Sequence, residues 1–344
     1  MSFGRFSGRP QLAVDLGTAN TVVYRRGHGI VLFEPSIVAI DERTGSVYAV
    51  GAEARRMIGR TPAHISATRP LRDGVIADFE MTEQMLRHFT RRATGGKRLR
   101  ADVMVCVPSG ITQVERNAVT RAAQAAGATH AYLIEEPMAA AVGAGLPVAE
   151  PRGALVVDIG GGTTETAITA LGTLAVVNSI KVGGYQLDDA IVRSIQQQEG
   201  LLIGQEQAEA LKIEIGSAYG NADVPGHAEV AGRDLATGLL RRVSISSLQI
   251  AAALQHPLAQ IVAAVKDVLD RTPAELSADL IEQGITIVGG GALLPGLDTL
   301  LATQTGLSVT VADEPLLTVA VGAGQALEEM ETLRPRKRDR RRSA

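Results

Sequence analysis

Hydrophobic residues follow two different periods along this chain. Some stretches alternate apolar and polar residues at every second position, which is typical of strands, and others repeat at helical spacing. Strand patterns and helix patterns take turns along the sequence, so we expect α/β halves whose sheets are largely covered by helices. The expected strands are residues 12–15, 22–25, 29–40, 102–107, 155–158, 165–169, 174–182 and 285–288, and the expected helices are 81–92, 112–126, 187–198, 206–216, 248–269 and one that follows 289–291 and ends near residue 300.

The sequence also contains an internal repeat. LAVDLGTANT at 12–21 is echoed by LVVDIGGGTT at 155–164. In each copy an apolar strand reaches an aspartate, Asp15 or Asp158, and a Gly/Thr turn and a second strand follow. The copies lie about one domain length apart, so we predict two related halves with a linker at 143–151.

Composition narrows the possible functions. The 344 residues are 45% hydrophobic and 21% charged with a net charge of -3, a globular balance that suits about two domains. Only 3% are aromatic and Trp is absent, which disfavours an aromatic stacking platform, and the near-neutral charge argues against a nucleic-acid partner. Cys106 is the only cysteine, so an internal disulfide or a cysteine metal cluster is excluded and a reducing compartment is expected.

Targeting signals are weak. No apolar segment has the length of a membrane span, and the first ten residues lack the apolar block of a signal peptide. We therefore expect a cytoplasmic protein that is peripheral to the inner face of the membrane. The basic run RPRKRDRRR at 334–342 predicts either a solvated, disordered tail or a contact with anionic lipid or a partner.

The two repeated turns suggest phosphate chemistry. A tight glycine turn directs several backbone N–H groups at one point, and Thr or Asn side chains add donors. A single turn of this kind is often an ordinary hairpin, but one from each half could grip a polyphosphate from opposite sides, with Asp15 and Asp158 holding Mg²⁺ through water. The predicted contacts are Gly17, Thr18, Ala19, Asn20 and Thr21 in the first turn and Gly160, Gly161, Gly162 and Thr163 in the second.

A third glycine cluster lies between an expected strand and an expected helix, at Gly289, Gly290, Gly291 and Ala292. Small residues at a helix start can accept a phosphate or lie against a ribose and base, and close strand–helix packing is the alternative. Neither a Walker A motif nor a strand-linked GxGxxG with its downstream acid is present, which disfavours P-loop and Rossmann chemistry.

Two acids, Glu135 and Glu136, stand just before Pro137, which suits the first turn of an alanine-rich helix. Carboxylates complement a helix N-terminus in any protein, so the pair also has a purely structural interpretation. In the functional interpretation one of them orients a water for attack on a γ-phosphate. Because successive strand residues face opposite sides, only one of the two can point into the cleft.

Other side chains give weaker signals. Glu206, Glu209 and Lys212 share one side of a helix and either reach a nucleoside or form ordinary exposed pairs. The six histidines lack zinc-enzyme spacing, and Ser109 lies in PSG instead of GxSxG, so a zinc enzyme and a hydrolase elbow are both disfavoured.

Taken together, these motifs resemble the actin-like ATPases. DLGTANT at 15–21 is similar to their first phosphate loop, DIGGGTTE at 158–165 to the second, and GGGALL at 289–294 to the adenosine loop. Over residues 11–330 the chain more closely resembles the bacterial MreB/Mbl cell-shape family. The stretches that carry this resemblance are GIVLFEPS at 29–36, RPLRDGVIAD at 69–78, VPSG at 107–110, LIEEPMAAA at 133–141, LLIG at 201–204, KIEIG at 212–216 and RTPAEL at 271–276.

The resemblance implies an actin-like ATPase fold, in which two duplicated lobes, each with a large and a small subdomain, enclose ATP and Mg²⁺. Glu136 is similar to the family's water-positioning residue and Thr163 to the threonine beside it, so these two, with Asp15 and Asp158, are the expected catalytic residues of slow ATP hydrolysis. The expected bounds are 1–145 for the first lobe (small subdomain about 38–70), 146–320 for the second (small subdomain about 183–248), 321–333 for a helix that returns to the first lobe and 334–344 for a basic disordered tail.

The implied partners are other copies of the chain in paired protofilaments, the cell-wall synthesis machinery and the membrane surface. Three residues depart from the family's pattern: Ala210 replaces a basic residue, Tyr185 stands where an acid or amide is usual, and Pro295 replaces a common arginine. None of them removes a proposed catalytic carboxylate.

Membrane attachment also differs from the family's pattern. Members often use an amphipathic N-terminal helix or an apolar loop, whereas this chain offers only Phe3 and Phe6 in a poor helix-forming segment and has a basic loop. We expect electrostatic docking in which each base adds about 1 kcal/mol near anionic lipid. The bases concerned are Arg91, Arg92, Lys97, Arg98, Arg100 and those of the tail.

Three rival functions remain at this point. A small-molecule kinase on the same ATPase core would need an acceptor pocket and a further base, for which the sequence offers no additional set of residues. A chaperone ATPase would need a large substrate-binding domain, yet little chain follows Ala326. A nucleotide-binding paralogue that polymerises poorly and acts as an adaptor stays open.

Overall fold

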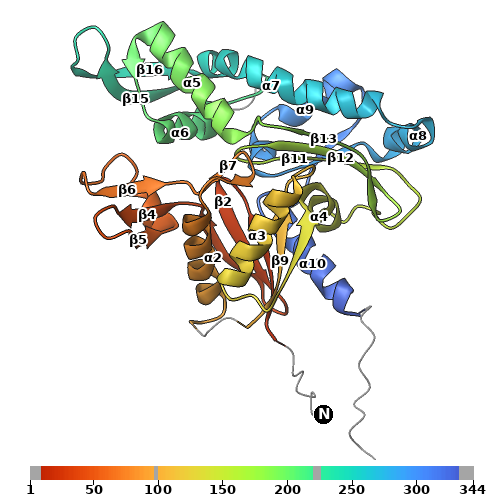
Figure 1. The fold of residues 1–344 in the computed structure, drawn as a ribbon. Coiled ribbons are helices and arrows are strands. Elements are labelled where there is room, and N and C mark those ends of the chain that lie inside the picture. Colours follow the sequence, from red (N-terminus) through yellow and green to blue (C-terminus); the bar gives the residue numbers. More distant parts are fainter. Residues whose placement is uncertain (1–8, 97–99, 220–225, 333–344) are drawn as a thin grey trace, which may run out of the picture.

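The computed structural model describes residues 9–96, 100–219 and 226–332. It has two lobes, which lie one above the other in Figure 1. The first lobe, below, runs from β1 to α4, and the second lobe, above, runs from β11 to β18. The last helix, α10 (Thr318–Thr332), returns to pack on α4, β1 and β2 of the first lobe.

Each lobe is built on a five-stranded sheet, and the two sheets have the same topology. Read from the antiparallel edge, the orders are β3-β2-β1-β9-β10 and β13-β12-β11-β17-β18. In each sheet the first three strands are antiparallel to their neighbours, and the last two continue parallel to the third. This equivalence confirms the duplication predicted from the repeated sequence. The strands are β1 Gln11–Leu16, β2 Asn20–Arg25, β3 Gly29–Pro35, β9 Asp102–Val107, β10 His130–Glu135, β11 Ala154–Ile159, β12 Thr164–Ala170, β13 Thr173–Ile180, β17 Ile285–Val288 and β18 Val309–Val311.

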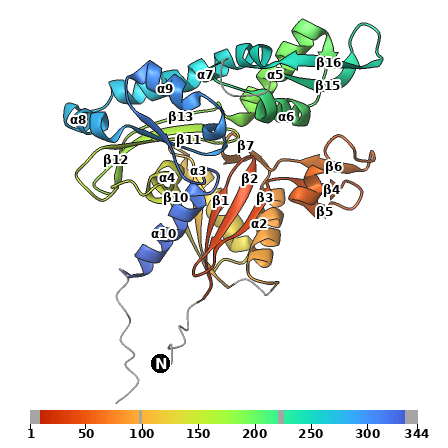
Figure 2. The ribbon, with the colours of Figure 1, turned by 180° about the vertical axis from the view of Figure 1, so that it is seen from behind.

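Smaller sheets extend the lobes. In both views the β5-β4-β6 sheet of the first lobe and the β14-β15-β16 sheet of the second project from the same side of the molecule (Figures 1 and 2). A two-stranded ladder of β7 and β8 lies between the first small sheet and α2 in the chain. The strands are β4 Val38–Asp41, β5 Ser46–Val50, β6 Ile65–Thr68, β7 Leu71–Arg72, β8 Val75–Ile76, β14 Leu201–Leu202, β15 His227–Asp234 and β16 Leu240–Ser246.

Helices begin and end close to the expected residues in most cases, with one error. The helix expected directly after the third glycine cluster is only a 3₁₀ turn, Gly290–Leu293, and α9 begins later, at Leu297. Pro295 lies between them and lacks the N–H that a helix interior requires. The helices are α1 Ala52–Arg55, α2 Phe79–Ala93, α3 Gln113–Ala125, α4 Glu136–Gly143, α5 Gly184–Glu199, α6 Gln205–Ile215, α7 Ser247–Asp270, α8 Ala274–Gln283 and α9 Leu297–Thr305.

Helix α7 corrects another expectation. By length and composition it is long and apolar enough to cross a membrane, contrary to the expectation that the chain contains no such segment. Its apolar residues Ile250, Leu254 and Ile261 are buried in the core of the second lobe beneath the sheet strands. Packing against this core accounts for the apolar face, so α7 is a core helix.

Small residues pack the boundary between the lobes. Ala139, Ala140 and Ala141 of α4 are fully buried in a cluster that includes residues of both sheets and of α10. A side chain at Gly322 of α10 would overlap the backbone of α4, so the two helices approach more closely than larger residues allow. This contact fixes α4, and therefore its first residue, relative to both sheets.

Candidate functional site

The two repeated turns and the third glycine cluster line one cavity of about 440 Å³ between the lobes. The first turn joins β1 to β2 and the second joins β11 to β12, so each hairpin presents its turn at the edge of its own sheet. Residues predicted from sequence that lie on the cavity wall are Asp15, Gly17, Thr18, Ala19, Asn20, Glu136, Asp158, Gly160, Gly161, Gly162, Thr163, Glu209, Lys212, Gly289, Gly290 and Gly291.

The two turns touch each other across the lobe boundary. A Cβ added at Gly161 would lie 2.6 Å from the Cβ of Ala19, and one added at Gly162 would lie 3.0 Å from Thr18 Oγ1 and 3.1 Å from the Cα of Asp73. These separations are shorter than the optimal carbon contact of about 3.5–4.0 Å. Glycine at these positions is therefore what allows the phosphate-loop candidates of the two lobes to meet.

Glycine is also required in the third cluster. Gly289 has a φ of 80°, and its Cβ would lie 2.5 Å from the carbonyl oxygen of Ile159 and against a carboxylate oxygen of Asp158. The cluster can thus lie directly beside the end of β11. Backbone groups from three separate segments converge on the same cavity as a result.

Three carboxylates face this cavity: half-buried Asp15 near the end of β1, and buried Asp158 and Glu136, near the end of β11 and at the start of α4. Burial raises the pKa of Asp15 to about 7. The pKa of Asp158 is raised to about 8, by burial first and then by Asp15, and the pKa of Glu136 is raised well above its usual value by burial and by both aspartates. Among the described residues, no hydrogen bond or ion pair reaches these three side chains.

Such a cluster fits a bound cation. Uncompensated buried carboxylates are unfavourable, and a divalent ion would offset their mutual repulsion. Within the described ranges no group of three His, Cys, Asp or Glu side chains is close enough to hold a metal directly. Mg²⁺ commonly keeps several waters and uses few carboxylates, so Asp15 and Asp158 could hold it through water together with phosphate oxygens.

The neighbouring acids Glu135 and Glu136 separate as the strand pattern predicted. Glu135 accepts a hydrogen bond from Arg116 Nη2 at 2.9 Å on the surface of the first lobe. Glu136 is 8% exposed and lies on the cavity wall. The expectation that only one of the two enters the cleft is confirmed, and the acid that enters is the one next to Pro137.

Three charged residues of α6, Glu206, Glu209 and Lys212, have protein partners. Glu209 accepts a hydrogen bond from Arg55 Nη2 at 2.5 Å, and Glu206 lies 3.8 Å from Arg55 Nε. Lys212 Nζ donates to Asp188 Oδ1 at 2.7 Å and to the carbonyl of Gly184 at 3.2 Å. These side chains hold the cavity wall together, and Glu206 itself does not line the cavity.

Two other predicted contacts lie off the cavity wall. Thr21 is fully buried, and its hydroxyl lies 2.8 Å from that of Ser36. Ala292 is 5% exposed and packs in the core of the second lobe, which matches the close-packing alternative. Some of the wall residues that the sequence prediction missed lie within motifs noted for their family resemblance: Phe33, Gly74, Ile213, Leu293 and Leu294. The others are Val22, Arg55, Gly184, Tyr185, Leu187, Asp188, Pro295, Pro315, Leu316 and Val319.

Comparison with known proteins decides the family. The family model described as MreB/Mbl protein matches residues 9–335. The chain belongs to the MreB/Mbl family. It is 51% identical to the cell shape-determining protein MreB of Escherichia coli (strain K12), with 94% of each chain covered, and 47% identical to the cell shape-determining protein Mbl of Bacillus subtilis (strain 168), with 95% of this chain and 98% of the relative covered.

Solved structures agree with this assignment to the MreB/Mbl family. MreB5 of Spiroplasma citri bound to ADP superposes with a TM-score of 0.87 at 38% identity, covering 94% of this chain and 98% of that chain. The same protein bound to AMPPNP gives a TM-score of 0.89 at 37% identity, covering 94% and 97%. A MamK double helical filament shares the fold with a TM-score of 0.79 at 22% identity, covering 93% and 99%. The fold is therefore actin-like.

The structure explains one MreB/Mbl sequence motif in physical terms. In the stretch 69–78, the backbone N–H of Gly74 donates to Thr18 Oγ1 at 2.9 Å, and its Cβ would lie 2.5 Å from Pro108. This glycine has a φ of 76°, which favours glycine. The motif thus holds the first phosphate-loop candidate in place through the hydrogen bond between Gly74 and Thr18, which are far apart in the sequence.

Proposed function

We propose that this MreB/Mbl family member binds ATP and Mg²⁺ in the cavity between its lobes, hydrolyses the ATP slowly, and assembles into paired protofilaments that organise cell-wall synthesis and cell shape at the inner membrane surface. The observation that carries the proposal is the meeting of two duplicated glycine turns beside the unpaired Asp15 and Asp158. Support comes from the relatives' description as cell shape-determining and from the nucleotides named for Spiroplasma citri MreB5.

In this proposal the backbone N–H groups of both turns bind the phosphates. Asp15 and Asp158 would hold Mg²⁺ through water, and the ion would supply positive charge that offsets charge on the phosphates. Glu136 accepts a hydrogen bond from the attacking water and takes up its proton at a carboxylate oxygen, while the hydroxyl of Thr163 orients that water. Glu136 is 8% exposed, so its own carboxylate has little contact with bulk water.

The test of this assignment compares adjacent acids. Glu136→Ala should still bind ATP but lose most phosphate release, because the group that orients the water is gone. The matched control is Glu135→Ala, at the residue just before Glu136. It removes an ion pair with Arg116 and should leave phosphate release near the wild-type rate. Wild-type turnover in Glu136→Ala would reject the assignment.

Family membership favours this proposal over the small-molecule kinase considered from the sequence. ATP turnover should be the same with and without small hydroxyl or carboxyl acceptors. The adaptor alternative is tested by electron microscopy of the purified protein on anionic lipid. Paired protofilaments that form only with nucleotide would support the proposal, whereas nucleotide binding without filaments would favour the adaptor.

Electrostatic membrane docking is part of the proposal. Arg91, Arg92 and Arg100 are exposed, but Arg92 Nη1 lies 2.7 Å from Glu34, so this cation is already paired. Phe3, Phe6, Lys97, Arg98 and the tail at 334–344 lie outside the described residues. Vesicle binding that is insensitive to salt would contradict docking by charge. The lobe and subdomain bounds given above, 1–145 and 146–320, likewise remain part of the proposal.

A further inference from the structure

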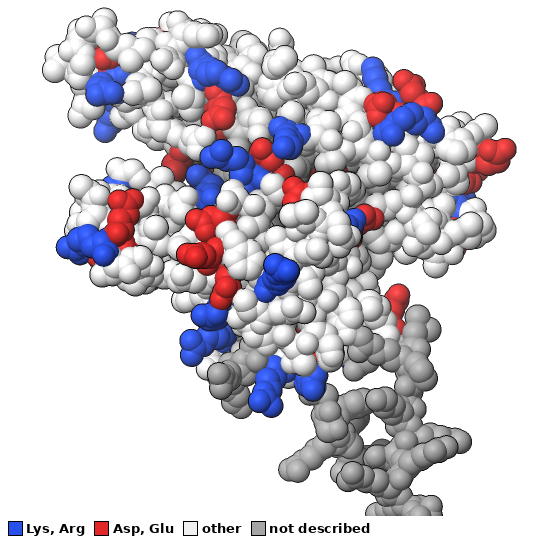
Figure 3. Space-filling model, viewed as in Figure 1, with Lys and Arg blue, Asp and Glu red and all other residues white. Residues whose placement is uncertain are grey.

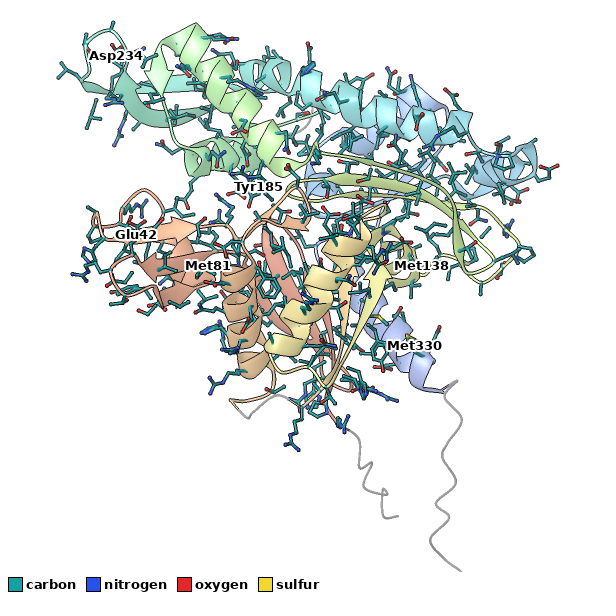
Figure 4. All side chains as sticks on the ribbon, in the orientation of Figure 1. Glu42, Met81, Met138, Tyr185, Asp234 and Met330 are labelled. Atoms are coloured by element: carbon teal, nitrogen blue, oxygen red, sulfur yellow. The ribbon has the colours of Figure 1, made fainter. Side chains whose placement is uncertain are left out.

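Tyr185 connects the two lobes. It is the second residue of α5, and its backbone N–H donates to the carbonyl of Gly161 at 2.8 Å, so it is fixed to the second glycine turn. Its side chain lies at the junction of the lobes (Figure 4) and lines the nucleotide cavity. A side chain in this place can influence how closely the two lobes approach each other.

The Tyr185 side chain makes its polar contacts with the first lobe. Its hydroxyl accepts a hydrogen bond from Arg69 Nε at 3.0 Å and lies 3.5 Å from the carbonyl oxygen of Thr18. The guanidinium carbon of Arg69 is also 4.7 Å from the centre of the tyrosine ring, within the range of a cation–π contact.

A second contact crosses the cavity mouth nearer to solvent. Arg55 of the first lobe contacts Glu209 of the second at 2.5 Å, and both residues line the cavity. Their side chains are 42% and 32% exposed, so salt screens this pair. Charged side chains of both signs also gather along the lobe boundary in Figure 3.

These two contacts have a common consequence. A nucleotide held between turns from different lobes can leave only if the turns separate or the mouth widens. Either movement stretches the Arg69–Tyr185 contact, the Arg55–Glu209 contact, or both. Because neither pair belongs to the carboxylate cluster at Glu136, breaking them should alter residence of the nucleotide more than the chemical step.

We propose that Arg69 with Tyr185 and Arg55 with Glu209 form a cross-cleft latch that holds the lobes closed and thereby sets how slowly bound nucleotide leaves. Tyr185 acts in it as a positioning residue: it holds the first glycine turn, through Arg69 and Thr18, against the second. This inference rests on the proposed binding of nucleotide in the cavity.

The experiment follows the release of radiolabelled ATP from the full-length protein with Mg²⁺, after a chase with unlabelled ATP, at protein concentrations below assembly. Tyr185→Phe keeps the ring but removes the hydroxyl acceptor, and it should speed release roughly tenfold, as expected for a hydrogen bond to a charged group. Tyr48→Phe, a change at a tyrosine that is 61% exposed, is the matched control and should release ATP at the wild-type rate.

Coupling distinguishes a latch from a general loss of structure. Arg69→Gln should speed release by a similar factor, and the double variant Arg69→Gln/Tyr185→Phe should be no faster than the faster single variant, because both remove one contact. In all three, the rate of single-turnover hydrolysis should fall by a smaller factor than the one by which release speeds up. Multiplicative effects, or hydrolysis that falls together with retention, would overturn the proposal.

Salt dependence tests the outer pair. Release from the wild type should accelerate roughly threefold between about 50 and about 500 mM NaCl, and Arg55→Gln should be fast and nearly insensitive to salt. Arg43→Gln, which breaks an exposed ion pair with Asp41 inside the first lobe, should keep the wild-type salt response. If wild type retains no ATP, the proposed function fails; if it retains ATP and every latch variant releases it at the wild-type rate, only the latch fails.

Discussion

Gly161→Ala is the most direct perturbation of the meeting between the two glycine turns. The new methyl group would lie 2.6 Å from the Cβ of Ala19, whereas two carbons pack best at about 3.5–4.0 Å. Its distance to the backbone nitrogen of Ala19 would be 3.1 Å. The obstacle is therefore partly main chain, which cannot rotate aside, and the turns must separate by about 1 Å.

A displacement of this size is large for a phosphate site. Hydrogen bonds weaken steeply once donor and acceptor are about 0.5 Å beyond their best distance, and a misplacement of about 1 Å can cost on the order of 100-fold in activity. We expect Gly161→Ala to bind ATP about 10- to 100-fold more weakly, measured by titration calorimetry with Mg²⁺. Thermal unfolding without nucleotide should change little, because the overlap is relieved by opening the lobes.

The control and the refuting result are well defined. Gly226→Ala adds a methyl group at a glycine that has no atom within 4 Å of its Cβ position, and it should bind ATP like the wild type. If Gly161→Ala also binds ATP with wild-type affinity, contact between the two turns is not needed for binding. The reasoning from the glycine turns would then be refuted even if the protein still bound nucleotide elsewhere.

Two further predictions concern stability. Burial raises the pKa of Asp188 to about 6 although Lys212 lowers it, so the folded state binds this proton more tightly than the unfolded state and stability is lost as pH rises from about 4 to about 6. Lys212→Met should raise this pKa further. In urea unfolding, the free energy of unfolding of this variant should be near the wild-type value at about pH 4 and lower by about 3 kcal/mol at about pH 8. A loss of stability that does not depend on pH would contradict the argument. Gly322→Ala should lower the free energy of unfolding by about 1–3 kcal/mol, because its Cβ would lie 2.5 Å from the backbone nitrogen of Gly143 across the α4–α10 crossing. An alanine with room to spare would instead stabilise the helix by about 1 kcal/mol, so the sign of the change in a denaturant titration decides.

Local sequence carries much of the fold and part of the site. The repeated turns were predictable because a strand, an aspartate and a glycine turn lie within about ten residues in each copy, and the same local pattern produces the same hairpin. Helix α7 was expected at 248–269 and spans Ser247–Asp270, since its period is regular and Ser246 caps it. Strand alternation also predicted that only one of Glu135 and Glu136 reaches the cavity, whereas the choice of Glu136 depended on the family resemblance.

The rest of the site depends on contacts that no local pattern encodes. Arg55 and Glu209 are far apart in sequence and meet only when both lobes are assembled, so the helix spacing of Glu209 gave no information about its partner. The sequence left Lys212 either against a nucleoside or in an ordinary charged pair, and its pairing with buried Asp188 is seen only in the folded protein. Pro295 was visible in the sequence and, given its missing N–H, should have ended the helix expected across it.

The duplication gives this arrangement its physical logic. A single hairpin turn supplies donors from one side only, and both lobes must close before Gly161 and Ala19 approach each other. In the proposed function, ligand contact and lobe closure therefore coincide, so the energy of binding a phosphate is available to drive the movement of two whole lobes. Burial raises the pKa of Glu136, and Asp15 and Asp158 raise it further, so these acids repel one another across the lobe boundary. A phosphate and a cation bound together would then favour closure, and this dependence would allow a bound nucleotide to control how one copy of the chain presents its surfaces to the next.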